Sequence, residues 1–252
     1  MNTGSLYTHI QNGVATLEFF HRAGNSLPID LLNRLVEAFK QLSANRDVRV
    51  IILKSDGDGA FCAGASLVEL STISNFEEGK KFFMGFANVI NAMRTCTKLI
   101  IGRIQGKAVG GGVGLIAACD YCYASIQASI KLSELTVGIG PFVIAPALER
   151  RIGIAALSEL SLGARSWKNA YWAKEKGLYG EVFDSSEEMD KEIDTLTLEL
   201  SKYNPEALKE LKKEFWKQAE NWNILLEQQA EISGKLVLSN YTKEALDKFK
   251  NH

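Results

Sequence analysis

The stretch Gly106-Lys107-Ala108-Val109-Gly110-Gly111-Gly112-Val113-Gly114-Leu115 is a glycine-dense turn between two apolar segments. The segment before it, residues 99–104, is predicted to be a buried strand, and the segment after it has the composition of a short helix. Glycine lets the backbone turn sharply and lets a ligand approach the main chain closely. The first turn of a helix also leaves N–H groups without partners. This pattern predicts an anion site or an oxyanion hole, although close packing of strand on helix needs glycine too.

Length and composition exclude several classes of protein. The chain has 252 residues, of which 46% are hydrophobic, enough for one large domain or one domain with an appendage. A net charge of −1 gives no sign of a nucleic-acid partner or of a polybasic membrane surface. No apolar run reaches the length of a membrane span, and the first residues do not resemble a signal peptide. We therefore expect a cytoplasmic protein.

The cysteines do not predict a disulfide framework or a metal site. Cys62, Cys96, Cys119 and Cys122 are too few for a disulfide scaffold in a chain of this length. The CxxC spacing of the last two could serve metal or redox chemistry, but they lie in an apolar segment without a second CxxC or a nearby histidine. We therefore expect no metal.

Strands and helices alternate along the first part of the chain. Residues 7–11 and 14–20 read as two strands joined by Asn12-Gly13, the strongest two-residue hairpin signal. The strands and helices that follow predict an α/β core of parallel strands over residues 1–184. Residues 143–162 read as two short helical pieces broken at Gly153. Residues 185–252 read instead as successive amphipathic helices, over residues 187–203, 205–222, 224–238 and 242–249. This region has too few residues to bury a hydrophobic core of its own, so it should pack on the main body or on a neighbouring subunit.

A second glycine-containing turn, Ala63-Gly64-Ala65-Ser66, also follows a predicted strand and precedes a predicted helix. If the two strands belong to one parallel sheet, both turns emerge at the same edge. Their N–H groups could then converge on one carbonyl oxygen. Two such donors in a dry pocket stabilise an enolate or a tetrahedral oxyanion.

With these two turns, Leu132-Ser133-Glu134 and the later Gly138, the chain resembles the crotonase (enoyl-CoA hydratase/isomerase) superfamily over nearly its whole length. The resemblance implies a spiral of ββα units with a C-terminal helical region that builds homotrimers, often stacked into hexamers. It implies an acyl-CoA thioester as the substrate and no separate cofactor, because coenzyme A is part of the substrate.

The resemblance also implies roles for individual residues. The N–H groups of Ala65 and Gly111 would form the oxyanion hole. Coenzyme A would lie against Arg22-Ala23 and Ala63, and Lys248 would reach its phosphates. The remaining residues expected to bind the substrate or coenzyme A are Gly64, Gly110, Gly114 and Phe142.

The catalytic carboxylates depart from the usual pattern of the family. Hydratases of this family usually use two glutamates, and Gly114 stands where the first would be. Glu134 stands where the second would be. One carboxylate suits an isomerase that moves a proton from C2 to C4, but it could also serve both steps of a syn addition of water. A non-catalytic acyl-CoA-binding protein is the third possibility.

The sequence motifs around Glu134 most resemble those of the methylglutaconyl-CoA hydratase-like branch of the family, which acts in leucine breakdown. A carboxylated acyl group would need a cation, and Arg150, Arg151 and Lys131 are the candidates. Ser66 replaces the aspartate usual in the family, but serine can still cap the helix that begins at the next residue.

Overall fold

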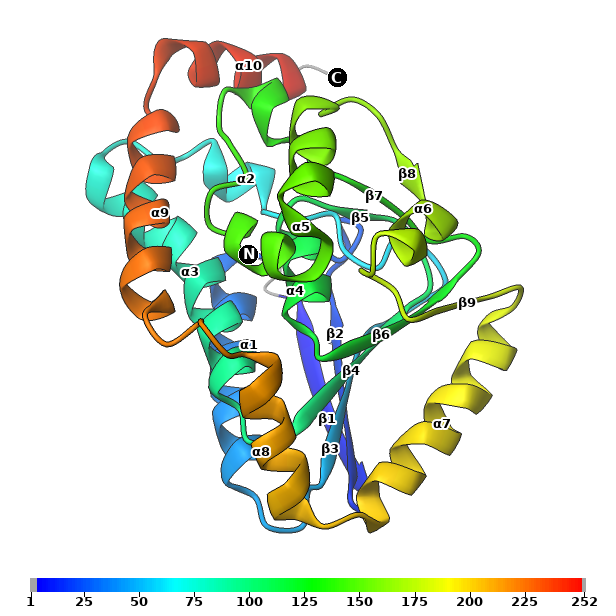
Figure 1. Cartoon of the computed structure of the whole chain (residues 1–252). Helices are drawn as coiled ribbons and strands as arrows, with labels where there is room; N and C mark the ends of the chain where they lie inside the picture. The colour runs from blue at the N-terminus through cyan, green and yellow to red at the C-terminus, as the bar shows by residue number, and fades with distance from the viewer. Residues whose placement is uncertain (1–3, 251–252) are drawn as a thin grey trace.

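The computed structural model describes residues 4–250 and has a six-stranded sheet at its centre, in the order β1-β2-β3-β4-β6-β9 (Figure 1). β1 and β2 pair antiparallel, and all later neighbours in this sheet pair parallel. Asn12 and Gly13 have φ angles of 51° and 80°, the positive values that a tight hairpin turn needs. The strands are β1 (Ser5–Gln11), β2 (Val14–Phe20), β3 (Val50–Ser55), β4 (Leu99–Ile104), β6 (Tyr121–Ser125) and β9 (Glu181–Phe183).

A second, three-stranded sheet consists of β5 (Ala108–Val109), β7 (Ser129–Lys131) and β8 (Lys168–Asn169). A bridge between Cys62 and Ala108 joins β5 to the loop that follows β3. β5 ends directly before the glycine-dense turn and β7 ends three residues before Glu134, so this small sheet positions the candidate site.

Helices cover the sheets, and their apolar residues recur at helical spacing. In α1 (Ile29–Ala44), for example, Leu31, Leu32, Leu35, Phe39 and Leu42 are buried. The break expected at Gly153 is confirmed, because this residue has φ 73° and ψ 163° inside α5. The other helices of this part are α2 (Leu67–Leu70), α3 (Phe76–Thr95), α4 (Gly111–Ala118), the 3-10 turn η1 (Glu134–Val137), α5 (Ala145–Leu162) and α6 (Ala170–Glu175).

The C-terminal helices pack on the main body, one of the two arrangements expected. α9 runs beside α3, and a Cβ on Gly79 would lie 2.8 Å from the Gly234 carbonyl oxygen (Figure 1). α10 contacts η1. One expected helix, residues 205–222, was too long: α8 ends at Phe215, and Gln218 has a φ of 73° that no helix accommodates. The bounds are α7 (Ser186–Lys202), α8 (Pro205–Phe215), α9 (Trp222–Leu236) and α10 (Asn240–Lys250).

A buried ion pair joins α8 to the core. The Asp120 carboxylate lies 2.9 Å from the Lys212 ammonium, and both side chains are at most 3% exposed. Asp120 also accepts hydrogen bonds from the Ile100 N–H and from the Trp216 indole N–H, each at 2.8 Å. Asp120 therefore has a structural role where α8 meets the core. Within residues 4–250, no helix is both long and apolar enough to cross a membrane.

Candidate active site

The two glycine turns lie against each other, as the parallel strands predicted. The Val109 N–H donates to the Cys62 carbonyl at 2.9 Å. Gly64 has a φ of +85°, and a Cβ there would lie 2.6 Å from the Val109 carbonyl oxygen and 3.5 Å from the Gly111 nitrogen. Glycine is therefore required at 64 both by its φ and by this close approach.

The N–H groups of Ala65 and Gly111 are available to a ligand. Both residues line the same cavity. Among residues 4–250, neither N–H donates a hydrogen bond to another protein group. Gly111 opens α4, where the first N–H groups have no partner within the helix. Two unpaired donors at one cavity can stabilise negative charge on a thioester oxygen.

Glu134 begins η1 and is held beside the second glycine turn. The Gly110 N–H donates to the Lys131 carbonyl at 3.0 Å, which ties the turn to β7. A Cβ on Gly110 would lie 2.6 Å from Glu134 Oε1, so any larger residue there would collide with the carboxyl group. At the other end of η1, Gly138 has a φ of +80° and lies under Tyr241 and Thr242 of α10.

The surroundings of Glu134 change its acidity. Glu134 Oε2 is buried and has no hydrogen-bond partner among the described residues. Burial raises the pKa of this carboxyl group to about 7, and only its own backbone N–H opposes the shift. A carboxyl group that titrates near neutral pH can both accept and return a proton.

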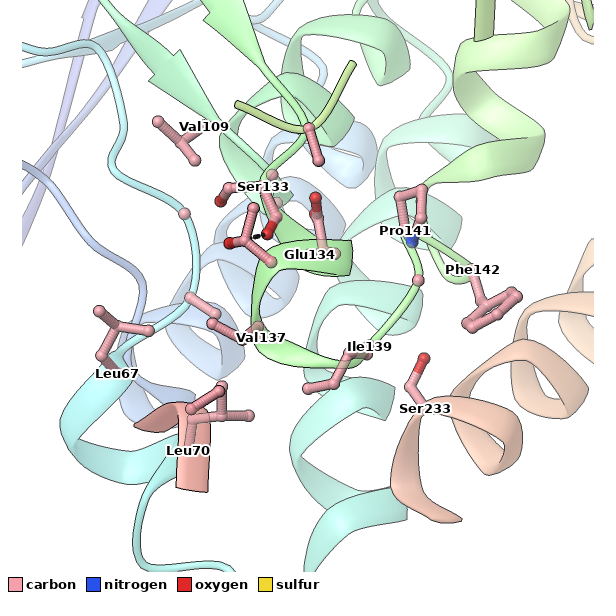
Figure 2. Close-up of a pocket in the computed structure, with 18 of the residues that line it drawn as sticks. Leu67, Leu70, Val109, Ser133, Glu134, Val137, Ile139, Pro141, Phe142 and Ser233 are labelled. Atoms are coloured by element: carbon pink, nitrogen blue, oxygen red, sulfur yellow. Dashed lines mark hydrogen bonds between the residues drawn. The ribbon is translucent and has the colours of Figure 1, made fainter. Parts of the chain in front are cut away.

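The cavity has a volume of about 820 Å³, which suits a small-molecule substrate. Figure 2 shows Glu134 in the middle of the lining residues, with Leu67 and Leu70 on one side and Pro141 and Phe142 on the other. Most lining side chains are apolar. The polar and charged side chains among them are Lys131, Ser133, Glu134, Thr136, Arg165, Ser233, Tyr241, Glu244 and Lys248.

Gly114 does not reach this cavity. It is buried in α4, and a Cβ there would lie 2.4 Å from Cγ2 and 2.8 Å from Cβ of Ile144. Ile144 thus occupies the space into which a side chain at position 114 would point. Two carboxylates are among the described residues that line the cavity: Glu134 lies beside the second glycine turn, and Glu244 lies on α10 with an exposed side chain.

The other expected site residues fall into two groups. Gly64, Gly110, Phe142 and Lys248 line the cavity. The segment Arg22-Ala23 and Ala63 do not line it but lie together beside it, since the Ala63 N–H donates to the Gly24 carbonyl at 2.9 Å. The structure therefore brings the first group together with Ala65, Gly111 and Glu134 at the cavity, while Arg22, Ala23, Ala63 and Gly114 are outside its lining.

Ser66 caps the N-terminus of α2, as the sequence predicted. Ser66 Oγ accepts a hydrogen bond from the Glu69 N–H at 3.3 Å. Glu69 in turn accepts a hydrogen bond from the Ile29 N–H at 2.8 Å, which links this turn to α1. Serine thus maintains the turn that holds Ala65.

Two of the three cations suggested for an acyl carboxylate lie elsewhere. Arg150 donates to the Ala117 and Phe215 carbonyls, and Arg151 donates to the Asp120 and Leu178 carbonyls. Neither lines the cavity. Their guanidinium groups satisfy backbone oxygens at the ends of helices and strands.

Lys131 does line the cavity, together with Arg165, which the sequence did not single out. Arg165 follows α5 in an irregular segment, so no periodic pattern or motif marks it. Only its place in the folded chain brings it next to the cavity.

Comparison with known proteins places this geometry in context. Residues 9–252 match the family described as Enoyl-CoA hydratase/isomerase. The chain is 32% identical over 199 residues to the peroxisomal Delta(3,5)-Delta(2,4)-dienoyl-CoA isomerase of Arabidopsis thaliana, covering 73% of this chain and 70% of that protein. It is 36% identical over 167 residues to the mitochondrial methylglutaconyl-CoA hydratase of Rattus norvegicus, covering 66% of this chain and 52% of that protein. The chain thus spans about half the length of the rat relative.

Solved structures agree on the fold. The enoyl-CoA hydratase from Bacillus halodurans superposes with a TM-score of 0.89 at 23% identity, covering 96% of this chain and 99% of that one. A likeness at this level of identity concerns the fold alone.

Proposed function

Because the chain belongs to the enoyl-CoA hydratase/isomerase family, we propose that it adds water to a 2-enoyl-CoA thioester to give a 3-hydroxyacyl-CoA. One observation carries the proposal. A single buried carboxyl group, whose burial raises its pKa to about 7, shares a cavity with two unpaired N–H groups. This is the set of groups that an enolate mechanism needs.

In the proposed reaction Glu134 acts twice. Its carboxylate accepts a proton from water while the water oxygen forms a bond to C3 of the enoyl group. The π electrons move toward the thioester, and the N–H groups of Ala65 and Gly111 stabilise the charge on the thioester oxygen. Glu134 then returns the proton to C2 as the carbonyl re-forms. Water is thereby added on one face, and the carboxylate is regenerated.

The same residues support a second candidate, the isomerisation of a 3-enoyl to a 2-enoyl thioester. Ile144 fills the space at Gly114, so a second carboxylate has no place there. One carboxylate is sufficient when a proton only moves between C2 and C4. The identity to the plant dienoyl-CoA isomerase favours this alternative as well.

Mass spectrometry after incubation with crotonyl-CoA and with 3-methylglutaconyl-CoA distinguishes the candidates. A gain of one water on either ester supports hydration. Conversion of a 3-enoyl-CoA to its 2-enoyl isomer would support the isomerase instead, and because the mass does not change, the ultraviolet absorbance of the conjugated thioester reports it. Tight binding of the esters with no turnover would support a non-catalytic acyl-CoA-binding protein.

Glu134→Gln tests the assigned carboxylate. We expect this variant to bind CoA esters but to lose about 100-fold or more of kcat, because amide nitrogen and oxygen cannot exchange the proton. Glu199→Gln, an exposed position on α7, is the matched control and should retain the wild-type rate. A near-normal rate in the Glu134 variant would overturn the mechanism. The homotrimer or hexamer implied by the resemblance stays a prediction.

A further inference from the structure

A second, smaller cavity lies at the other end of the central sheet from the glycine turns. It has a volume of about 260 Å³, and we call it the basal pocket. Its lining comes from the end of α1, the residues just before β3 and β4, and the start of α8. The cations and hydroxyl groups among its lining residues are Ser43, Arg46, Arg49, Thr97, Lys98 and Lys209.

The basal pocket is far from the candidate active site. Arg49 directly precedes β3 and Lys98 directly precedes β4, whereas the two glycine turns follow these parallel strands. Each strand has six residues, so about 20 Å separates its two ends. In Figure 1 the turn between α7 and α8 lies at the bottom of the view, and α10, which lines the active-site cavity, lies at the top. A ligand in the basal pocket would therefore not touch the groups assigned to the reaction.

Four cations surround the basal pocket, and only part of their charge is neutralised. Among the described lining residues Glu206 is the single carboxylate, and it pairs with Lys209 at 3.3 Å. Arg46, Arg49 and Lys98 form no ion pair within residues 4–250. The whole chain has a net charge of −1, so this excess of positive charge is local.

The cations of the basal pocket are close enough to repel one another. Burial lowers the pKa of the Lys98 ammonium, and the charges of Arg49 and Lys209 lower it further. The carboxylate of Glu206 opposes this shift only in part. Folding thus holds like charges together, which costs stability unless an anion binds between them.

Backbone contacts hold the unpaired cations in place. The Arg49 guanidinium donates to the Arg46 carbonyl at 2.6 Å, and the Arg49 N–H donates to the Gly13 carbonyl at 2.7 Å. The Lys98 carbonyl accepts a hydrogen bond from the Lys212 ammonium at 2.8 Å. The segments that carry these charges are therefore fixed before any ligand binds.

Two hydroxyl groups add hydrogen-bonding capacity to the basal pocket. The Thr97 N–H donates to Ser43 Oγ, and Thr97 Oγ1 donates to the Ser43 carbonyl, each at 2.9 Å. Ser43 Oγ lies 3.2 Å from Thr97 Oγ1. Ser43 can therefore donate its own hydroxyl hydrogen either to Thr97 or to a ligand.

The size and the donors of the basal pocket indicate the class of ligand. Pockets for drug-sized molecules have volumes of about 300–1,000 Å³, and the basal pocket is smaller. Guanidinium groups match phosphate oxygens with two parallel N–H bonds, and ammonium groups bind phosphate as point charges. We propose that the basal pocket binds a small phosphate-bearing anion through Arg46, Arg49 and Lys98. This inference does not depend on the proposed function.

Calorimetric titration with inorganic pyrophosphate at constant ionic strength tests the inference. In the wild-type protein we expect one anion per chain, with a dissociation constant of about 0.1 mM or lower. The double variant Arg49→Met with Lys98→Met should weaken this binding by about tenfold or more. Lys213→Met is the matched control, because it removes an exposed cation of α8 that does not line the pocket, and its affinity should equal that of the wild type.

Two further titrations sharpen the test. Arg46→Met changes an exposed side chain and should weaken binding severalfold even if the double variant folds poorly. Titration with ADP distinguishes the sources of the phosphate groups. ADP binding that also depends on Arg49 and Lys98 supports a phosphate carried by a larger molecule, whereas binding of pyrophosphate alone supports a free anion.

Three outcomes would overturn the inference. One is the absence of saturable pyrophosphate binding by the wild-type protein up to about 1 mM. Another is an unchanged affinity in both the Arg46 variant and the double variant. The third is a loss of affinity in Lys248→Met together with no loss in the basal-pocket variants. Since Lys248 lines the active-site cavity, the anion would then occupy the site expected for the phosphates of coenzyme A.

Discussion

Glu134→Gln should change how the stability of the protein depends on pH. The folded protein raises the pKa of this carboxyl group from 4.5 to about 7. Between these values the folded state binds more protons than the unfolded state, so the wild-type free energy of unfolding falls as pH rises. Glutamine does not titrate, so the variant escapes this loss.

The size of the effect follows from the two pKa values. Burial of the ionised carboxylate costs about 0.8 kcal/mol at pH 5 and about 3.4 kcal/mol at pH 8, relative to the protonated form. The variant should therefore gain about 2.5 kcal/mol on the wild type between these two pH values. The pH-independent cost of burying an amide cancels in this difference.

Urea unfolding of both proteins at the two pH values measures the difference directly. Glu199→Gln serves as the control, and because its side chain is exposed on α7 it should follow the wild type at both values. The pH dependence of kcat/KM in the wild type gives a second measurement of the Glu134 titration. Activity should fall on the acid side with a midpoint near pH 7, because only the ionised carboxylate accepts a proton. A gain below about 0.5 kcal/mol would refute the reasoning. The carboxyl group would then be solvated in the folded protein.

Two further substitutions test how the site is built and how the C-terminal helices are attached. Gly114→Ala places a Cβ 2.4 Å from Ile144 Cγ2, so overpacking should cost about 1–3 kcal/mol, offset by up to about 1 kcal/mol from the better helix propensity of alanine. Thermal unfolding measures the loss, and Ile144→Ala in the same chain should restore part of it. Lys212→Met leaves the buried Asp120 carboxylate without its cation, so urea unfolding should show a loss of about 3–5 kcal/mol.

Each of these substitutions has a matched control. Gly85→Ala in α3 places a Cβ near the ends of two flexible side chains, which can move, so its effect should be small. Lys213→Met removes an exposed lysine next to Lys212, with an effect within about 0.5 kcal/mol. A Gly114 variant as stable as the wild type would show that Ile144 can move aside. Equal effects at the two lysines would show that the ion pair does not attach α8 to the core.

Local patterns in the sequence determined much of the fold. The Asn12-Gly13 hairpin, the break at Gly153 and the cap at Ser66 each depend on a few neighbouring residues, and all three are confirmed. The two glycine turns could be predicted to meet because parallel strands end at the same edge of a sheet. Glu134 could be chosen because its motif follows those turns.

Only the tertiary structure decided which charged side chains face the cavity. The sequence offered Arg150 and Arg151 as partners for an anion, but both guanidinium groups satisfy backbone carbonyls far along the chain. Arg165 stands in no motif, yet it lines the cavity. Likewise, Gly114 is adjacent to the site in sequence, and only the contact with Ile144 shows that it is closed off from it. Turns and caps are set by interactions between neighbours in the chain, whereas the surroundings of a long side chain are set by segments that meet only after folding.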